Sequence, residues 1–169
     1  MTLTDAVQLR TLRQIRWIIG IFIFGLVASG VTAFPLEWEL GLLVRWFDAS
    51  LQSPAGGLPW WLARVQQGLV ETNRAHPFMA YGTDWLAFGH LVIALFFIGP
   101  WRDPVANAWV LRIGMVACAG VLPLALICGP IREVPPYWRA IDCSFGIFGS
   151  IPLFIALRLS AKLAPRKAD

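Results

Sequence analysis

Three ionisable residues lie within or beside long apolar stretches and are the first candidates for chemistry in this sequence. Asp84 and His90 belong to the segment YGTDWLAFGH, and Asp142 belongs to YWRAIDCSFG. Histidine titrates near neutral pH and can relay a proton, which a nearby carboxylate can assist. Because ionisable groups are costly inside a membrane, their presence there indicates a binding or catalytic site.

A structural interpretation of the same residues stays open beside this one. A carboxylate at the start of a helix caps free N–H groups and favours the positive end of the helix dipole, as Asp84 and Asp142 would. Arg132 or Arg139 would then neutralise Asp142, and His90 would donate to a carbonyl of a neighbouring helix. Asp84 and His90 are separated by about 120° around a helix, so they share a site only if that site is broad.

Aromatic and basic side chains near these positions complete the candidate ligand-binding set. The further members are Trp85, Arg132, Tyr137, Trp138 and Arg139. The whole set provides carboxylates, guanidiniums and an imidazole, and the sequence assigns a catalytic role to none of them.

Several other chemistries lack the residues that they need. The sequence contains no metal-ligand spacing, phosphate-binding loop or nucleophile elbow. A bis-histidine haem needs two facing imidazoles, whereas His76 lies in a predicted loop, so we expect no metal and no cofactor. The three cysteines form no CxxC pair and fall in apolar segments, where they are expected to pack helices. A disulfide between Cys128 and Cys143 stays an alternative.

The composition indicates that a membrane surrounds these residues. Of the 169 residues, 57% are hydrophobic and 14% are charged, and the mean hydropathy is +0.64. Soluble domains carry roughly 25% charged residues, and a soluble fold of this length could not bury so much apolar surface. The net charge of +4 comes with no nucleic-acid-binding motif, and the basic residues flank apolar runs. We therefore expect membrane lipids as partners and no nucleic acid.

Four apolar stretches predict an all-α, polytopic membrane protein built as a four-transmembrane-helix bundle. A bilayer core of roughly 30 Å needs about 20 helical residues. The predicted transmembrane helices comprise residues 16–35, 83–101, 108–129 and 141–160, and an outer loop comprises residues 36–79. All of them are expected to belong to one integral membrane domain, residues 1–169.

The distribution of basic residues predicts that both termini are cytoplasmic, in the plasma membrane or, in a bacterium, the inner membrane. Cytoplasmic segments of membrane proteins carry an excess of Lys and Arg. With this topology most basic residues lie inside, namely Arg10, Arg13, Arg16, Arg102, Arg112, Arg158, Lys162, Arg166 and Lys167, against Arg45, Arg64, Arg74, Arg132 and Arg139 outside. Tryptophans, which prefer the membrane interfaces, sort to the inner side at Trp17, Trp101 and Trp109 and to the outer side at Trp38, Trp60, Trp61, Trp85 and Trp138.

The outer loop carries its own helical pattern. Apolar residues repeat at helical spacing on both sides of the break SPAGGLP, at Leu36, Leu40, Leu43, Val44, Phe47 and Leu51 and again at Trp61, Leu62, Val65 and Leu69. This pattern predicts two amphipathic helices in the outer interface. They would either form a lid or simply cover the outer end of the bundle.

Small residues predict where the transmembrane helices touch, because helices in lipid associate by close packing. The predicted stripes are Gly25, Ala28, Ser29 and Thr32 in the first helix, Gly114, Cys118, Val121, Ala125 and Cys128 in the third, and Gly146, Gly149 and Ala156 in the fourth. Pro123 and Pro152 each remove a backbone hydrogen bond and are expected to kink their helices.

The order of these elements resembles the EXPERA (emopamil-binding protein / sigma-2 receptor) superfamily. In both, a cytoplasmic N-terminus leads into a first helix, a long tryptophan-containing outer loop and three further helices. The resemblance implies a cavity lined by carboxylates that binds sterols or lipophilic amines, with His90 in TDWLAFGHLVIA at the position of the isomerase histidine. The acid expected four residues later is replaced by Ala94, and the third helix contains no acid, so isomerase chemistry is not implied.

Three functions follow from these observations. The first is binding of a lipophilic small molecule or lipid in a polar-lined cavity near the outer leaflet, with or without enzymatic activity. The second is a non-catalytic accessory subunit of a larger membrane complex, with other membrane subunits as partners, because the chain is small and rich in interfacial tryptophans. The third is a small oligomeric transporter, although no inverted repeat is visible.

Overall fold

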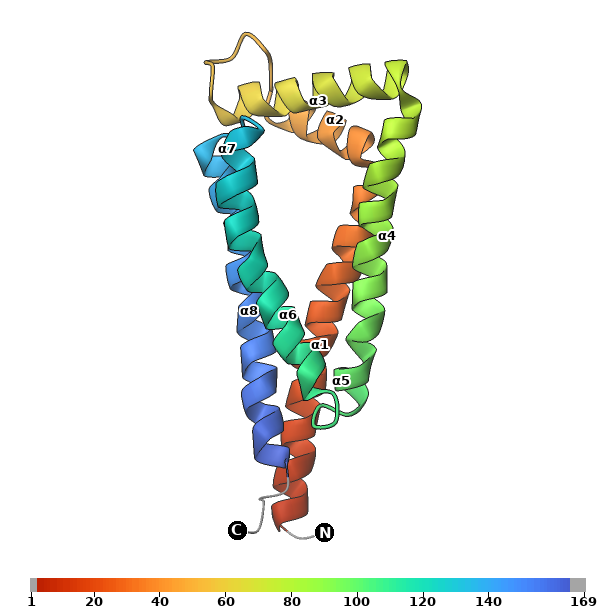
Figure 1. Cartoon of the computed structure of the whole chain (residues 1–169), viewed down its shortest axis with the longest axis vertical. Helices are drawn as coiled ribbons and strands as arrows, with labels where there is room; N and C mark the ends of the chain where they lie inside the picture. Colours follow the sequence, from red (N-terminus) through yellow and green to blue (C-terminus); the bar gives the residue numbers. More distant parts are fainter. Residues whose placement is uncertain (1–2, 165–169) are drawn as a thin grey trace. The chain divides into compact units, whose positions relative to one another are not determined.

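The computed structural model describes residues 3–164, which are mainly helical and contain no strand. This agrees with the predicted all-α class. The elements are labelled in Figure 1. They are α1 (Leu3–Ala33), α2 (Leu36–Trp46), α3 (Leu58–Ala75), the short 3-10 helix η1 (Pro77–Met79), α4 (Ala80–Phe96), α5 (Ile98–Arg102), α6 (Ala108–Pro123), the π-helical turn η2 (Leu124–Cys128), α7 (Gly129–Ile131) and α8 (Pro136–Leu163).

Four stretches of the described residues are long and apolar enough to cross a membrane. They are Asp5–Ala33, Pro77–Arg102, Ala108–Ile131 and Pro136–Leu163. Large apolar side chains on them are widely exposed, for example Phe24 at 73% and Val116 at 67%. Exposing such side chains to water costs free energy, whereas exposing them to lipid does not. The structure therefore contains four helices with the length and the composition that the predicted membrane-spanning helices require.

Apart from α6, which begins at Ala108 as predicted, the long apolar helices begin earlier in the chain than the apolar runs predict. The second spanning stretch begins at Pro77, and α8 begins at Pro136. Proline favours the first turn of a helix because its fixed φ fits and its missing N–H would have no partner there. The first turn of α8 therefore contains Tyr137, Trp138 and Arg139, which precede the predicted transmembrane helix of residues 141–160.

The chain divides into two compact units, which we describe separately. The first unit comprises Met1–Gly25 and Ile93–Asp169, and the second comprises Leu26–Val92. The expectation of one integral membrane domain stays a prediction.

Close packing of α6 against α8 dominates the first unit (Figure 1). A Cβ added at Gly146 would lie 2.5 Å from the carbonyl oxygen of Cys118, and one added at Gly114 would lie 2.9 Å from Cδ1 of Leu153. The helix backbones therefore touch directly, which confirms the predicted contact at Gly114, Cys118 and Gly146. The first turn of α1 and the last turn of α8 lie at the same end of this unit.

The helical hydrogen bonding differs after the two prolines that the sequence predicts to kink their helices. Directly after Pro123, α6 gives way to the π-helical turn Leu124–Cys128. A proline cannot donate to the preceding turn, and π-turns are one way in which a helix absorbs that loss. In contrast, α8 continues through Pro152 to Leu163.

In the second unit, the end of α1 packs against α4 at a single glycine. A Cβ added at Gly30 would lie 2.9 Å from the carbonyl oxygen of Ala87 and 3.1 Å from Cβ of His90. The predicted contact stripe of the first helix is wrong, because Gly25 has open space beside it and Ser29 and Thr32 are exposed. Gly30 makes the contact instead.

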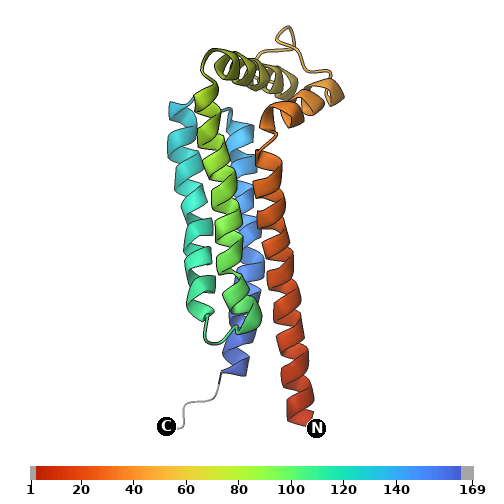
Figure 2. The same ribbon diagram turned by 90° about the vertical axis from the view of Figure 1, so that its right-hand side faces the viewer.

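The segment between α1 and α4 holds two packed helices, α2 and α3. Leu40 of α2 and Leu62 and Ala63 of α3 are buried. Residues 47–57 connect the two helices, and Gly56 has a φ of +82°, which glycine adopts without strain. Figure 2 shows α2 and α3 running across the direction of α4. Their location at a membrane interface stays a prediction.

Candidate ligand cavity

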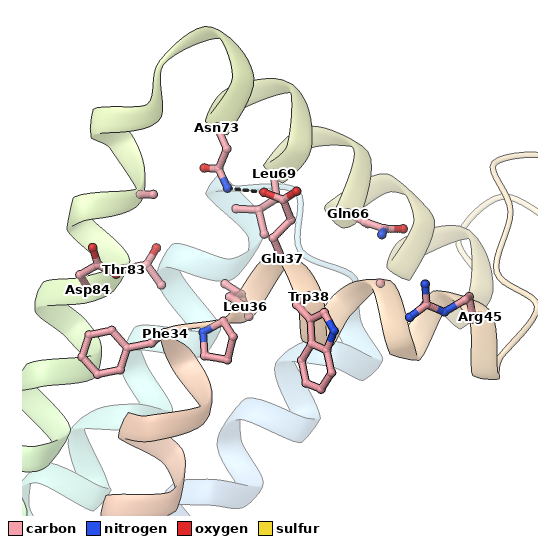
Figure 3. A pocket seen from close by; sticks show the side chains of 13 residues that line it. Phe34, Leu36, Glu37, Trp38, Arg45, Gln66, Leu69, Asn73, Thr83 and Asp84 are labelled. Carbon is pink, nitrogen blue, oxygen red and sulfur yellow. Dashed lines mark hydrogen bonds between the residues drawn. The ribbon is translucent and has the colours of Figure 1, made fainter.

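The second unit contains a cavity of about 540 Å³ between α2, α3 and the start of α4 (Figure 3). Ligand pockets in proteins range from about 300 to 1,000 Å³, so its size suits a small molecule or the end of a lipid. Its walls are formed by Phe34, Pro35, Leu36, Glu37, Trp38, Gly41, Arg45, Gln66, Leu69, Asn73, Ala80, Thr83 and Asp84.

The turn from α1 into α2 creates one wall of this cavity. Pro35 follows the last turn of α1 and precedes the first residue of α2. Helices usually end before the residue that precedes a proline, so Pro35 separates the two helices. Glu37 then lies in the first turn of α2, where the helix dipole favours a carboxylate.

A hydrogen bond joins α2 to α3 at the rim of the cavity. The side-chain nitrogen of Asn73 donates to Oε2 of Glu37 at 2.7 Å (Figure 3). A carboxylate can only accept, so the nitrogen of the Asn73 amide must face Glu37. The other amide atom, Oδ1 of Asn73, is buried and has no hydrogen-bond partner among residues 3–164. An unpaired buried acceptor costs roughly 1–3 kcal/mol, and a bound donor would remove that cost.

Hydrogen-bond acceptors outnumber cations around the cavity. Glu37 and Asp84 provide carboxylates, and Asn73 provides the unpaired carbonyl oxygen. Arg45 is the one cationic side chain in the cavity wall. This excess of acceptors favours a ligand whose polar end donates hydrogen bonds or is positively charged.

Large apolar side chains form another part of the wall. They are Phe34, Leu36, Trp38 and Leu69. Trp38 is 63% exposed and belongs to the same first turn of α2 as Glu37. A ligand with one polar end and one apolar end matches such a wall.

Asp84 is the member of the predicted site that lines this cavity. It is half-buried in α4, which begins at Ala80. The alternative that Asp84 caps the start of a helix is therefore wrong. The neighbouring Trp85 is 58% exposed and makes edge-on ring contacts with Tyr81 and Phe88 on its own helix.

His90 lies further along α4 and does not contribute to the cavity wall. Its Nδ1 is 2.9 Å from the carbonyl oxygen of Leu86, one turn earlier in the same helix. A carbonyl oxygen only accepts, so Nδ1 must donate in this hydrogen bond. The bond proposed from His90 to a neighbouring helix is thus replaced by one within α4.

The other five predicted site residues belong to the first unit, at the connection of α7 and α8. The alkyl chain of Arg139 packs so closely on Gly129 that a Cβ at Gly129 would overlap it. Within the described part of the chain, Nε of Arg139 and the hydroxyl of Tyr137 are buried without a hydrogen-bond partner. Asp142 is half-buried in the second turn of α8, so it does not cap that helix.

Arg132 and Trp138 complete this group. Arg132 is exposed in the turn after α7, and Trp138 is half-buried in the first turn of α8. The eight residues of the predicted site are thus divided between the two compact units, with Asp84, Trp85 and His90 in the second.

Most of the polar residues that line the cavity are not predicted from the sequence. Glu37, Arg45, Gln66 and Asn73 lie in the predicted outer loop, and Thr83 has no predicted role. The helical repeat of the outer loop predicted helices there, but a single sequence does not tell which polar faces of two such helices meet.

Metal and disulfide chemistry receive no support from the described residues. No group of three or more His, Cys, Asp or Glu side chains that could hold a metal ion occurs among them. Cys118, Cys128 and Cys143 are all free thiols, so the alternative of a Cys128–Cys143 disulfide is wrong for this structure.

The chain was compared with protein families, curated proteins and solved structures. No family model, curated protein or solved structure matches the chain.

Proposed function

We propose that this chain is an integral membrane protein that binds a lipophilic small molecule or lipid in the cavity of residues 26–92. The polar end of the ligand would lie among Glu37, Asn73 and Asp84, and its apolar end would run along Phe34 and Trp38. The observation that carries the proposal is a cavity of about 540 Å³ lined by Glu37, Asp84 and Asn73, the last of which has a buried and unpaired Oδ1.

The chemistry of the wall favours an amine as the polar end. An ammonium group donates up to three hydrogen bonds and carries a positive charge, so it complements Oδ1 of Asn73 and both carboxylates. A fatty acid would bring a further carboxylate to Glu37 and Asp84 and would be repelled. Such a preference accords with the resemblance to the EXPERA superfamily.

The proposal includes a position for the cavity in the membrane. With both termini cytoplasmic, α2 and α3 lie in the outer interface and the cavity faces the outer leaflet. Trp38, Trp46 and Trp60 on these helices are the side chains that prefer such an interface.

The test is the thermal stability of the purified full chain with paired ligands. A long-chain alkyl amine should raise the Tm in a concentration-dependent manner, whereas the fatty acid of equal chain length should not. Glu37→Gln and Asp84→Asn should each weaken the amine affinity, by roughly tenfold if the lost charge interaction is worth about 1.4 kcal/mol.

Glu39→Gln is the matched control for these variants. Glu39 lies on α2 beside Trp38 but does not line the cavity, and its replacement removes the same charge. If Glu39→Gln weakens amine binding as much as Glu37→Gln does, the amine binds to the general negative charge of α2. That result, or equal stabilisation by the fatty acid, would reject the proposal.

A further inference from the structure

A second groove, in the first unit, runs along one face of α1 beside α5. It has a volume of about 560 Å³ and is lined by Arg13, Arg16, Trp17, Gly20, Ile21, Phe24 and Trp101. The α1 residues recur every three or four positions and therefore share one helix face. Trp17, Ile21 and Phe24 are 69%, 66% and 73% exposed, so this face is open along its length.

Charge and apolar surface are separated along the groove. Both arginines lie at its N-terminal end, and no acidic residue among residues 3–164 lines it. From Arg16 to Phe24 the helix rises by roughly 12 Å, which is a substantial part of the length of an acyl chain. A molecule with an anionic end and an apolar tail complements this order.

Arg16 is held in place by the end of α5. Its Nε donates to the carbonyl oxygen of Trp101 at 3.3 Å, and its Nη2 donates to that of Arg102 at 3.4 Å. Its guanidinium also lies over the Trp101 ring, 5.9 Å from the ring centroid. A guanidinium has five N–H donors, so the remaining ones can bind a phosphate while these contacts fix its position.

Gly20 gives the groove its depth. A Cβ added there would meet only Nε1 of Trp101, at 3.8 Å, which is an ordinary contact. The absence of a side chain at Gly20 leaves room for an acyl chain between Trp17 and Phe24. The indole N–H of Trp101 lies beside this position and can donate to an ester carbonyl.

We infer that this groove is a binding site for an anionic phospholipid, with the phosphate at Arg13 and Arg16 and an acyl chain across Gly20 towards Phe24. The site is independent of the cavity of residues 26–92, and its occupant differs in charge. The arginines precede the apolar part of α1, which is where a phosphate at the membrane surface would meet them.

Native mass spectrometry of the full chain, in detergent with equimolar phosphatidylglycerol and phosphatidylcholine, tests the inference. The unmodified chain should retain phosphatidylglycerol in preference to phosphatidylcholine. Arg13→Gln should lower phosphatidylglycerol retention by roughly fivefold and phosphatidylcholine retention by less, because the choline cation offsets the phosphate charge. Gly20→Leu should lower the retention of both lipids, because it fills the tail part of the groove and leaves the charge intact.

Arg158→Gln is the matched charge control. Arg158 is an exposed arginine of α8 outside the groove, so its replacement should leave lipid selectivity unchanged. The inference is overturned if Arg158→Gln lowers phosphatidylglycerol retention as much as Arg13→Gln does, or if Gly20→Leu leaves retention unaltered. Displacement of the lipid by water-soluble glycerol phosphate would likewise overturn it, since the site would then select a phosphate and not a lipid.

Discussion

The α6–α8 contact and the cavity of residues 26–92 represent opposite ways of packing helices. In the first, Gly146 brings two backbones together so closely that no β carbon fits between them. In the second, α2, α3 and α4 leave about 540 Å³ between them, lined by both polar and apolar side chains. The contact carries small and apolar residues, whereas the cavity carries Glu37, Arg45, Asn73 and Asp84.

The difference follows from what each kind of helix gains by packing. Helices in lipid gain mainly from van der Waals contact, which small residues maximise. Helices that carry carboxylates, amides and a guanidinium cannot close in this way, because these groups need partners and take up space. The open arrangement is therefore the part of the molecule that can accept a ligand, and the tight contact is the part that supplies stability.

The largest effect is expected at the tight contact. Gly146→Ala places a β carbon against the carbonyl oxygen of Cys118 and should lower the free energy of unfolding by about 2–3 kcal/mol. Unfolding titrations in mixed detergent–SDS micelles measure this change. Gly120→Ala is the control, because its β carbon meets nothing within 4 Å. Equal losses in the two variants would mean that α6 and α8 are not in close contact.

A smaller loss is expected where α1 meets α4. Gly30→Ala places a β carbon near the Ala87 carbonyl and the Leu91 side chain, and the latter can move aside. We expect a loss of about 1–2 kcal/mol in the same titration. Gly25→Ala on the same helix should be neutral because Gly25 has open space beside it. A larger loss for Gly25→Ala than for Gly30→Ala would instead support the contact stripe of α1 that the sequence predicts.

At the rim of the cavity, Asn73→Ala removes the hydrogen bond to Glu37 and the unpaired oxygen together. Stability should fall by only about 1 kcal/mol, because Glu37 is exposed and water replaces the lost donor. Alkyl amine binding should weaken as well. Gln67→Ala, which removes the exposed bond to Glu71 at 2.7 Å, serves as the control and should leave amine binding intact.

The smallest effects are expected for two residues of the originally predicted site. His90→Gln and Asp142→Asn should leave the amine-induced rise in Tm unchanged, because neither side chain lines the cavity. Loss of this rise in either variant would mean that the ligand binds at the site predicted from the sequence.

The helices could be predicted from the sequence, whereas most residues of the site could not. Asp84 was found from its position beside an apolar run, since an acid there stands out in any sequence. Glu37 and Asn73 were not found, because 36 positions separate them and each looks like an ordinary polar residue of an amphipathic helix. Gly30 was missed for a related reason, as only its neighbours on α4 distinguish it from Gly25.

The sequence by itself determined the all-helical class and the four stretches able to cross a membrane, because apolar runs of this length have few other stable forms without water. It also predicted contact faces at Gly114, Cys118 and Gly146, since small residues stand out in the local sequence of a long apolar helix. Only the tertiary structure decided which polar residues surround the cavity and that the small-residue faces of α6 and α8 meet. Both depend on side chains far apart in the chain, whose meeting no local pattern of residues encodes.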